Sequence, residues 1–191
     1  MTFASKITVA RLLLVPVFAY LTLHYDHLRE LSQPDERWRI AALWVFIIAA
    51  ASDALDGYIA RKFNQHSEFG AFIDPIADKT LLLTGLCLLT WVDWGASGWR
   101  LPLWFFLLII ARDALILGGI GYLWHRGKSV KIAPHWSGKV CTVTQMIALG
   151  CVMLSLSPIP PLYPCALAAI FTIWSGVAYF RTGLAILLDK K

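Results

Sequence analysis

The sequence predicts an all-α integral membrane protein with six transmembrane helices and both termini in the cytoplasm. Hydrophobic residues make up 58% of the 191 residues and charged residues only 15%, so the chain has too few polar side chains to cover a water-soluble globule. Apolar runs of spanning length recur along the chain, and its four cysteines lie within them at irregular spacings. We therefore expect one membrane domain over residues 1–191.

Six apolar segments are candidate spans, because a spanning helix needs about 20 mostly apolar residues. They cover residues 7–24, 38–59, 72–92, 101–124, 139–157 and 163–187. The breaks between them carry the charged, glycine and proline residues that end apolar helices. These breaks are residues 25–37, 61–67, 93–100 and 125–139, and the proline cluster at 158–164. The sequence thus predicts six helices joined by short connections.

The distribution of Lys and Arg residues predicts the orientation, because cytoplasmic ends of spans carry an excess of them. With the N-terminus inside, the cytoplasmic ends hold Lys6, Arg11, Arg61, Lys62, Arg126, Lys128, Lys131, Lys139, Arg181, Lys190 and Lys191. The outer ends hold Arg29, Arg37, Arg39 and Arg100. The net charge of +5 then reflects topology and contacts with anionic membrane lipids, and no nucleic-acid partner is expected. Because the compact chain lacks a transit-peptide pattern, we expect it in a bacterial inner membrane.

Four aspartates occur where apolar spans should not contain them. Asp53 and Asp56 lie near the end of the second span, and Asp74 and Asp78 near the start of the third. An ionised side chain at membrane depth costs about 3 kcal/mol, so four together need a reason. The spacings i, i+3 and i, i+4 place each pair on one helix face, and both pairs fall at the cytoplasmic depth. Any one of them could instead be a structural partner of a base such as Lys79, but that explanation does not cover the whole array.

The chemistry of this array predicts a site for divalent cations and phosphate. Four like charges at one point repel strongly, so either some of the acids are protonated or cations lie between them. Carboxylates without accompanying His or Cys favour Mg²⁺ or Mn²⁺ over zinc, and such ions commonly bridge phosphate oxygens. Gly57 and Gly70 would let a ligand approach the backbone closely, and Arg61 could neutralise a pyrophosphate.

Residues 53–78 carry the pattern D-x2-D-G-x2-A-R-x8-G-x3-D-x3-D. At every fixed position it matches the signature of the CDP-alcohol phosphotransferase family, and the resemblance covers nearly the whole chain. This resemblance implies that Asp53, Asp56 and Asp74 ligate one or two Mg²⁺ or Mn²⁺ ions, which hold the pyrophosphate of a CDP-activated lipid. Asp78 would complete the metal site and act as the catalytic general base on the acceptor alcohol.

The resemblance also implies where the nucleotide binds. The residues expected to line the CDP pocket or approach its phosphates are Thr8, Gly57, Ala60, Arg61 and Gly70. Thr8 and Arg11 match a Thr-x-x-Arg pattern near the start of the first helix in relatives. The implied substrate is CDP-diacylglycerol, the implied product is CMP, and the implied assembly is a homodimer.

Other segments of the sequence indicate which alcohol is the acceptor. Residues 69–79 and 137–148 resemble the phosphatidylglycerophosphate synthases of the family, whose acceptor is glycerol 3-phosphate. Arg11, Arg112 and Lys139 are the expected acceptor-binding cations. For Arg112 the alternative is an ion pair with a neighbouring acid, and for Lys139 it is a membrane-topology anchor.

Other functions remain open at this point. Arg112-Asp113 also resembles the cardiolipin synthases of the family, which use phosphatidylglycerol, and relatives commonly carry an arginine where this chain has apolar residues and glycine at 117–120. An intramembrane prenyltransferase also uses Asp-rich motifs with Mg²⁺ and pyrophosphate, but its two motifs lie far apart in sequence. A cation transporter could use the acids as an ion path, but gives no role to Gly57 or Arg61.

Overall fold

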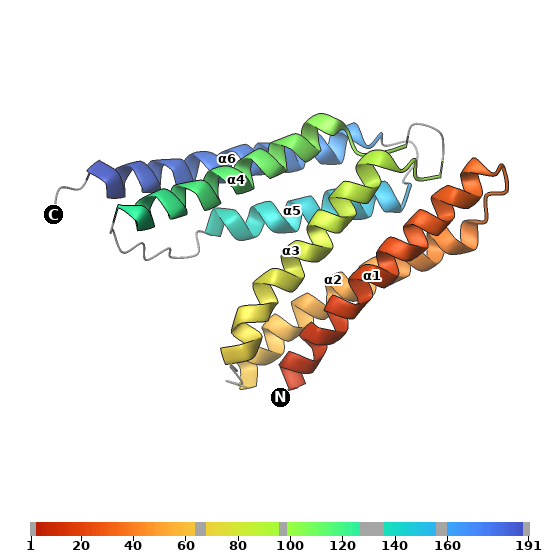
Figure 1. The fold of residues 1–191 in the computed structure, drawn as a ribbon, viewed down its shortest axis with the longest axis horizontal. Coiled ribbons are helices and arrows are strands. Elements are labelled where there is room, and N and C mark those ends of the chain that lie inside the picture. The colour runs from red at the N-terminus through yellow and green to blue at the C-terminus, as the bar shows by residue number, and fades with distance from the viewer. Residues whose placement is uncertain (1–2, 64–67, 96–98, 127–135, 156–159, 189–191) are drawn as a thin grey trace. The chain divides into compact units, whose positions relative to one another are not determined.

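The structure is a computed structural model that describes residues 3–63, 68–95, 99–126, 136–155 and 160–188, without the side chains of residues 3–8, 53–78 and 124. Its elements are six α-helices, and no strand occurs within the described residues, which confirms the all-α prediction. The helices are α1 (Phe3–Glu30), α2 (Glu36–Phe63), α3 (Glu68–Trp91), α4 (Leu103–His125), α5 (Trp136–Met153) and α6 (Leu162–Leu188). Figure 1 shows them in chain order from red to blue.

Three segments are long and apolar enough to cross a membrane among the residues that the structure describes. They are Val9–Glu30 in α1, Leu103–Leu123 in α4 and Leu162–Leu188 in α6. Lys79–Trp91, the part of α3 with described side chains, is apolar but shorter. Within the described side chains, membrane character is therefore clearest for α1, α4 and α6, and the count of six spans stays a prediction.

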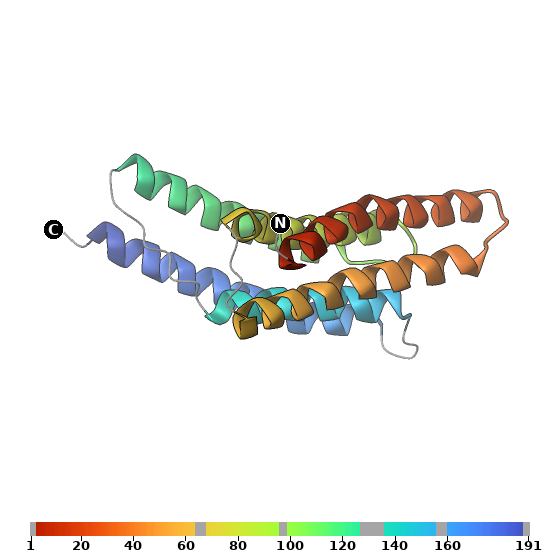
Figure 2. The same cartoon turned by 90° about the horizontal axis from the view of Figure 1, so that it is seen from below.

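The chain folds into two compact units. Unit 1 comprises residues 1–100 and 149–157, and unit 2 comprises residues 101–148 and 158–191. In unit 1, α1 packs against both α2 and α3, with α2 antiparallel to the other two (Figures 1 and 2). The rings of Phe18 and Phe46 lie 5.7 Å apart between α1 and α2. Ala42 and Ala49 of α2 are also fully buried, and small residues of this kind allow membrane helices to pack closely.

The segment after α3 is fastened to the end of α5 within unit 1. The carbonyls of the last turn of a helix have no partner in the helix itself and need donors from elsewhere. The indole of Trp94 donates to the Met153 carbonyl at 2.6 Å, and the indole of Trp99 donates to the Val152 carbonyl at 2.9 Å. Arg39 Nη1 donates to Ser155 Oγ at 3.1 Å just beyond the helix. These donors satisfy the carbonyls at the end of α5, which lies at Met153, before the predicted limit of 157.

Charged residues join the end of α1 to the same segment. The two terminal nitrogens of Arg29 each contact a carboxylate at 3.1 Å, one from Asp26 and one from Asp93. The contact with Asp26 is an i, i+3 pair, which supports helical structure. It helps to explain why α1 continues to Glu30, although the apolar run predicted an end near residue 24.

Unit 2 is built on α4 and α6, which run side by side in the same direction, with residues 136–148 of α5 running the opposite way (Figure 1). Phe105 and Ile109 of α4 and Ala168 of α6 belong to its buried core. Many large apolar side chains remain exposed, among them Leu103, Leu107, Leu117, Leu167, Ile170 and Ile173. Exposed apolar surface of this kind suits a lipid environment rather than water.

We expect replacement of Trp94 by Phe to lower the stability of the fold by about 1–3 kcal/mol. The variant leaves the Met153 carbonyl without its indole donor and opens a small cavity at a fully buried position. Thermal unfolding in detergent measures the effect. Trp44→Phe is the matched control, because the Trp44 side chain is exposed. Equal melting temperatures for the two variants would contradict the role given to the indole N–H.

Candidate active site

Helix ends gather at one end of unit 1. The start of α1, the end of α2 and the start of α3 lie near one another there in both views (Figures 1 and 2). Asp53 and Asp56 fall in about the last three turns of α2, and Asp74 and Asp78 in about the first three turns of α3. Because both segments are helical, the i, i+3 and i, i+4 spacings put each pair of positions on one helix face. The backbone thus brings the motif-bearing segments to one place.

The side chains of this motif lie outside the described residues. The predicted positions concerned are Thr8, Asp53, Asp56, Gly57, Ala60, Arg61, Gly70, Asp74 and Asp78. Among the side chains that are described, no group of three or more His, Cys, Asp or Glu residues could hold a metal ion. The donor set of the motif is four carboxylates on two adjoining helix segments, which fits a hard divalent cation. Its side-chain geometry stays a prediction.

Arg11 lies in α1 in the same unit. Its side chain is buried, with only 1% exposed, and full burial is rare for arginine. The prediction placed this cation in the acceptor site. Its burial shows that the guanidinium is part of the interior of unit 1 rather than a loosely held surface charge.

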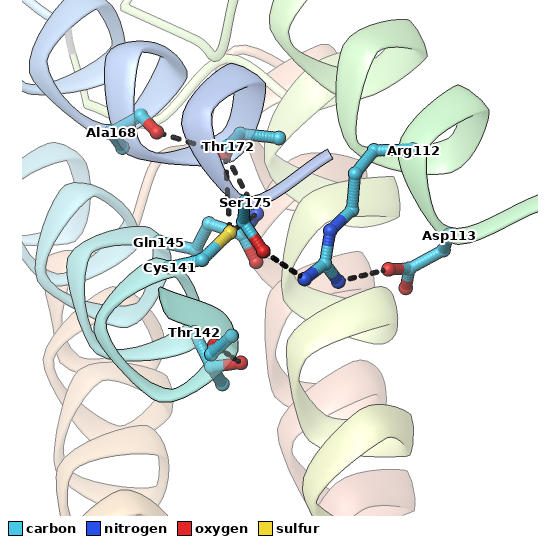
Figure 3. A network of polar contacts seen from close by, with 9 residues as sticks. Arg112, Asp113, Cys141, Thr142, Gln145, Ala168, Thr172 and Ser175 are labelled. Carbon is cyan, nitrogen blue, oxygen red and sulfur yellow. Dashed lines mark hydrogen bonds and ion pairs between the residues drawn. The ribbon is translucent and has the colours of Figure 1, made fainter. Parts of the chain in front are cut away.

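Arg112 lies in the middle of α4 in unit 2 and is held by polar contacts on two sides. Its Nη1 donates to Asp113 Oδ1 at 2.7 Å, and its Nη2 donates to Ser175 Oγ of α6 at 2.6 Å (Figure 3). The ring of Tyr179 lies 5.6 Å from the guanidinium carbon, which is within the range of a cation–π contact. The ion pair with a neighbouring acid, expected as the alternative for Arg112, is therefore present.

A second polar group lies beside this pair in unit 2. Gln145 Nε2 donates to Thr172 Oγ1 at 3.0 Å and contacts Cys141 Sγ at 3.2 Å. Thr172 Oγ1 donates in turn to the Ala168 carbonyl at 2.8 Å (Figure 3). The side chains of Gln145 and Thr172 are buried. Unit 2 thus has a line of buried polar side chains between α5 and α6, next to the arginine on α4.

Lys139 lies in the first turn of α5, and its side chain is exposed. The preceding Gly138 is in close contact with α6, since a Cβ there would stand 3.0 Å from Tyr179 Oη. Tyr179 therefore touches the start of α5 and also covers Arg112. The two predicted acceptor cations of unit 2, Arg112 and Lys139, are linked through this one tyrosine.

Comparison with known proteins agrees with the motif. The family model described as CDP-alcohol phosphatidyltransferase matches residues 1–180. The chain belongs to this family. A relative from Haemophilus influenzae is 34% identical over 96% of this chain and 94% of its own length. Relatives from Escherichia coli K12 and Shigella flexneri are 32% identical over 97% of both chains. All three are named CDP-diacylglycerol–glycerol-3-phosphate 3-phosphatidyltransferase.

The matched range includes the whole Asp motif and every predicted site residue. Sequence reasoning did not find Ser175, Thr172 or Gln145, which the structure places around the Arg112 pair. One signal was available for Gln145: Ser137, Cys141 and Gln145 recur at i, i+4 and i+8, and this spacing marks one helix face.

We expect the effect of Gly138→Ala on the stability of the fold to depend on Tyr179. Alanine in a helix is favoured over glycine by about 1 kcal/mol, and Gly150→Ala in the same helix should show this gain because nothing lies within 4 Å of its Cβ position. At Gly138 the close Tyr179 Oη should cancel the gain. In a Tyr179→Phe background the gain should return, since the ring carbons lie 3.5 and 3.7 Å away.

Thermal unfolding of the four combinations of residues 138 and 179 measures this coupling. An identical effect of Gly138→Ala in both backgrounds would contradict the contact between the start of α5 and Tyr179.

Proposed function

We propose that this chain transfers the phosphatidyl group of CDP-diacylglycerol to glycerol 3-phosphate, giving phosphatidylglycerophosphate and CMP. The observation that carries the proposal is similarity over nearly the full length to relatives named for this reaction. The Asp motif supports it, because its four acids fall on helix segments that adjoin at one end of unit 1.

The proposed roles of the motif follow from its chemistry. Asp53, Asp56, Asp74 and Asp78 would hold one or two Mg²⁺ or Mn²⁺ ions, which supply charge neutralisation at the pyrophosphate. Asp78 would also take the proton of the acceptor hydroxyl, so that its oxygen can attack the phosphorus bearing the diacylglycerol. A new phosphorus–oxygen bond forms there as the bond to the bridging oxygen of the pyrophosphate breaks, and CMP leaves with that oxygen.

The nucleotide side of the site would be formed by small and basic residues. Gly57, Ala60 and Gly70 give the backbone of CDP-binding segments without bulky side chains. Arg61 would contact the phosphates, and Thr8 would contribute from the start of α1. We propose six spans with both termini in the cytoplasm of a bacterial inner membrane, so that CMP departs into the cytoplasm while the acyl chains stay in lipid. A homodimer is the assembly proposed with it.

The acceptor side would be formed by cations. A phosphate monoester near neutral pH carries close to two negative charges, and Arg11, Arg112 and Lys139 supply positive charge for it. Burial of Arg11 and the two-sided hold on Arg112 favour defined positions for these guanidinium groups, which bind phosphate through paired N–H donors.

The reaction is tested by CMP release from the purified protein with CDP-diacylglycerol and Mg²⁺. We expect turnover with glycerol 3-phosphate and its loss, by a factor of 100 or more, in Asp78→Asn, because removal of a general base typically costs 10²–10⁴-fold. Asp93→Asn is a matched control, since Asp93 pairs with Arg29 in unit 1 outside the motif. Turnover with phosphatidylglycerol alone would instead identify a cardiolipin synthase, which the Arg112-Asp113 pair also resembles.

The acceptor cations are tested by Arg112→Gln and Lys139→Gln. We expect each to raise the KM for glycerol 3-phosphate about tenfold or more, because a charge-assisted hydrogen bond contributes about 1.5–3 kcal/mol. The KM for CDP-diacylglycerol should change little. Arg126→Gln is the control, as this exposed arginine contacts Tyr122 Oη at 2.8 Å near the end of α4. Unchanged acceptor kinetics in both variants would remove these residues from the acceptor site.

A further inference from the structure

Ser175 is a buried hydroxyl in the middle of α6, with 0% of the residue exposed. Its oxygen accepts a hydrogen bond of 2.6 Å from Arg112 Nη2 (Figure 3). Other hydroxyls in these helices donate to the carbonyl four residues earlier, as Thr172 does to Ala168 and Thr182 does to Ala178. Those contacts satisfy the hydroxyl locally. The Ser175 contact instead joins two helices through a charged side chain.

The surface of α6 follows the shape of the Arg112 side chain along its length. A Cβ at Gly176 would stand 3.6 Å from Arg112 Cγ, so glycine lets the aliphatic stem lie close to α6. Ser175 meets one terminal nitrogen, and the ring of Tyr179 lies over the guanidinium carbon. Three residues of α6 therefore hold this arginine: Gly176 contacts its aliphatic part, Ser175 its terminal nitrogen and Tyr179 the plane of its guanidinium group.

The two hydrogen-bond partners of Arg112 differ in charge. Asp113 is an acid, and its contact at 2.7 Å lowers the cost of placing a cation inside an apolar helix pair. Ser175 is neutral, so it fixes the guanidinium without reducing its positive charge. Arg112 Nε is buried and has no hydrogen-bond partner within the described residues. An unfilled donor on a buried cation is costly unless a ligand completes it.

We propose that Ser175 is a positioning residue that holds Arg112 in the orientation in which it binds the phosphate of the acceptor. This inference rests on the proposed function, in which Arg112 contacts glycerol 3-phosphate. The physical reason is the flexibility of arginine. A free side chain loses rotamer entropy when a ligand immobilises it, and the contact with Ser175 removes much of that loss before the acceptor arrives.

The test compares the steady-state kinetics of Ser175→Ala with those of Thr172→Val. Both variants delete a buried hydroxyl of α6, but only Ser175 contacts Arg112. We expect Ser175→Ala to raise the KM for glycerol 3-phosphate about five- to tenfold, with kcat and the KM for CDP-diacylglycerol within twofold. This split is typical of lost ground-state binding. Thr172→Val should lower the melting temperature without this change in KM.

A double-mutant cycle shows whether Ser175 acts through Arg112. In an Arg112→Gln background, Ser175→Ala should have no further effect on the KM for the acceptor. Ser175→Cys, which keeps the size of the side chain but is a weaker acceptor, should give an intermediate KM and serves where the alanine variant does not fold.

Two results would overturn the inference in different ways. If Arg112→Gln raises the acceptor KM and Ser175→Ala does not, Ser175 is structural and the proposed function stands. If Arg112→Gln itself leaves the acceptor KM unchanged, the acceptor role of Arg112 fails and the role of Ser175 fails with it. In this second case the unsubstituted protein still releases CMP from CDP-diacylglycerol. If it releases none, the proposed reaction itself is wrong.

Discussion

The high cost of an unpaired polar group in lipid shapes the contacts seen in this chain. A backbone or side-chain group that loses water must find a partner inside the protein, or it costs several kcal/mol. Thr90 and Thr172 follow this rule by donating to the carbonyl one turn earlier, at 2.6 and 2.8 Å. The end of α5 follows it through the indoles of Trp94 and Trp99. Even a connecting segment is thereby tied to a particular helix end.

The same constraint separates the charges of the chain into two kinds. Arg112 has a counterion in the next residue and a neutral partner on α6. These two contacts within the chain offset most of the free energy needed to bury the cation. The acids of the Asp motif are four charges of one sign on two adjoining helix segments. Carboxylates alone cannot neutralise one another, so we propose that this array holds cations from outside the chain. Arg112 is paired within the chain, which supports a structural role for it. The acids of the motif share one sign, which supports the proposal that they hold metal ions.

The sequence was sufficient for features that depend on local pattern. Apolar runs predicted all six helices, and the spacing within residues 53–78 identified the family. Helix ends differ from the predicted limits where distant residues contribute contacts. The end of α5 is capped by Trp94, which is 59 positions away from Met153, and the end of α1 carries the ion pairs of Arg29. Ser175 could not be found in advance, because its meaning depends on which face of α6 packs against α4. A serine within an apolar span has the same local pattern whether it satisfies itself or holds an arginine.

Charge also bears on the choice between the two proposed acceptors. Glycerol 3-phosphate is a monoester with close to two negative charges, whereas the phosphodiester of phosphatidylglycerol carries one. Since Asp113 already offsets much of the charge of Arg112, that pair alone would attract an incoming phosphate only weakly. A dianion therefore needs a further cation. Lys139 is the next residue after Gly138, which packs against Tyr179, and the ring of Tyr179 lies over Arg112. A monoanion would gain much less from the second charge. The proposed acceptor site, with a compensated arginine beneath Tyr179 and an exposed lysine next to Gly138, is thus better matched to the soluble monoester than to a lipid phosphodiester.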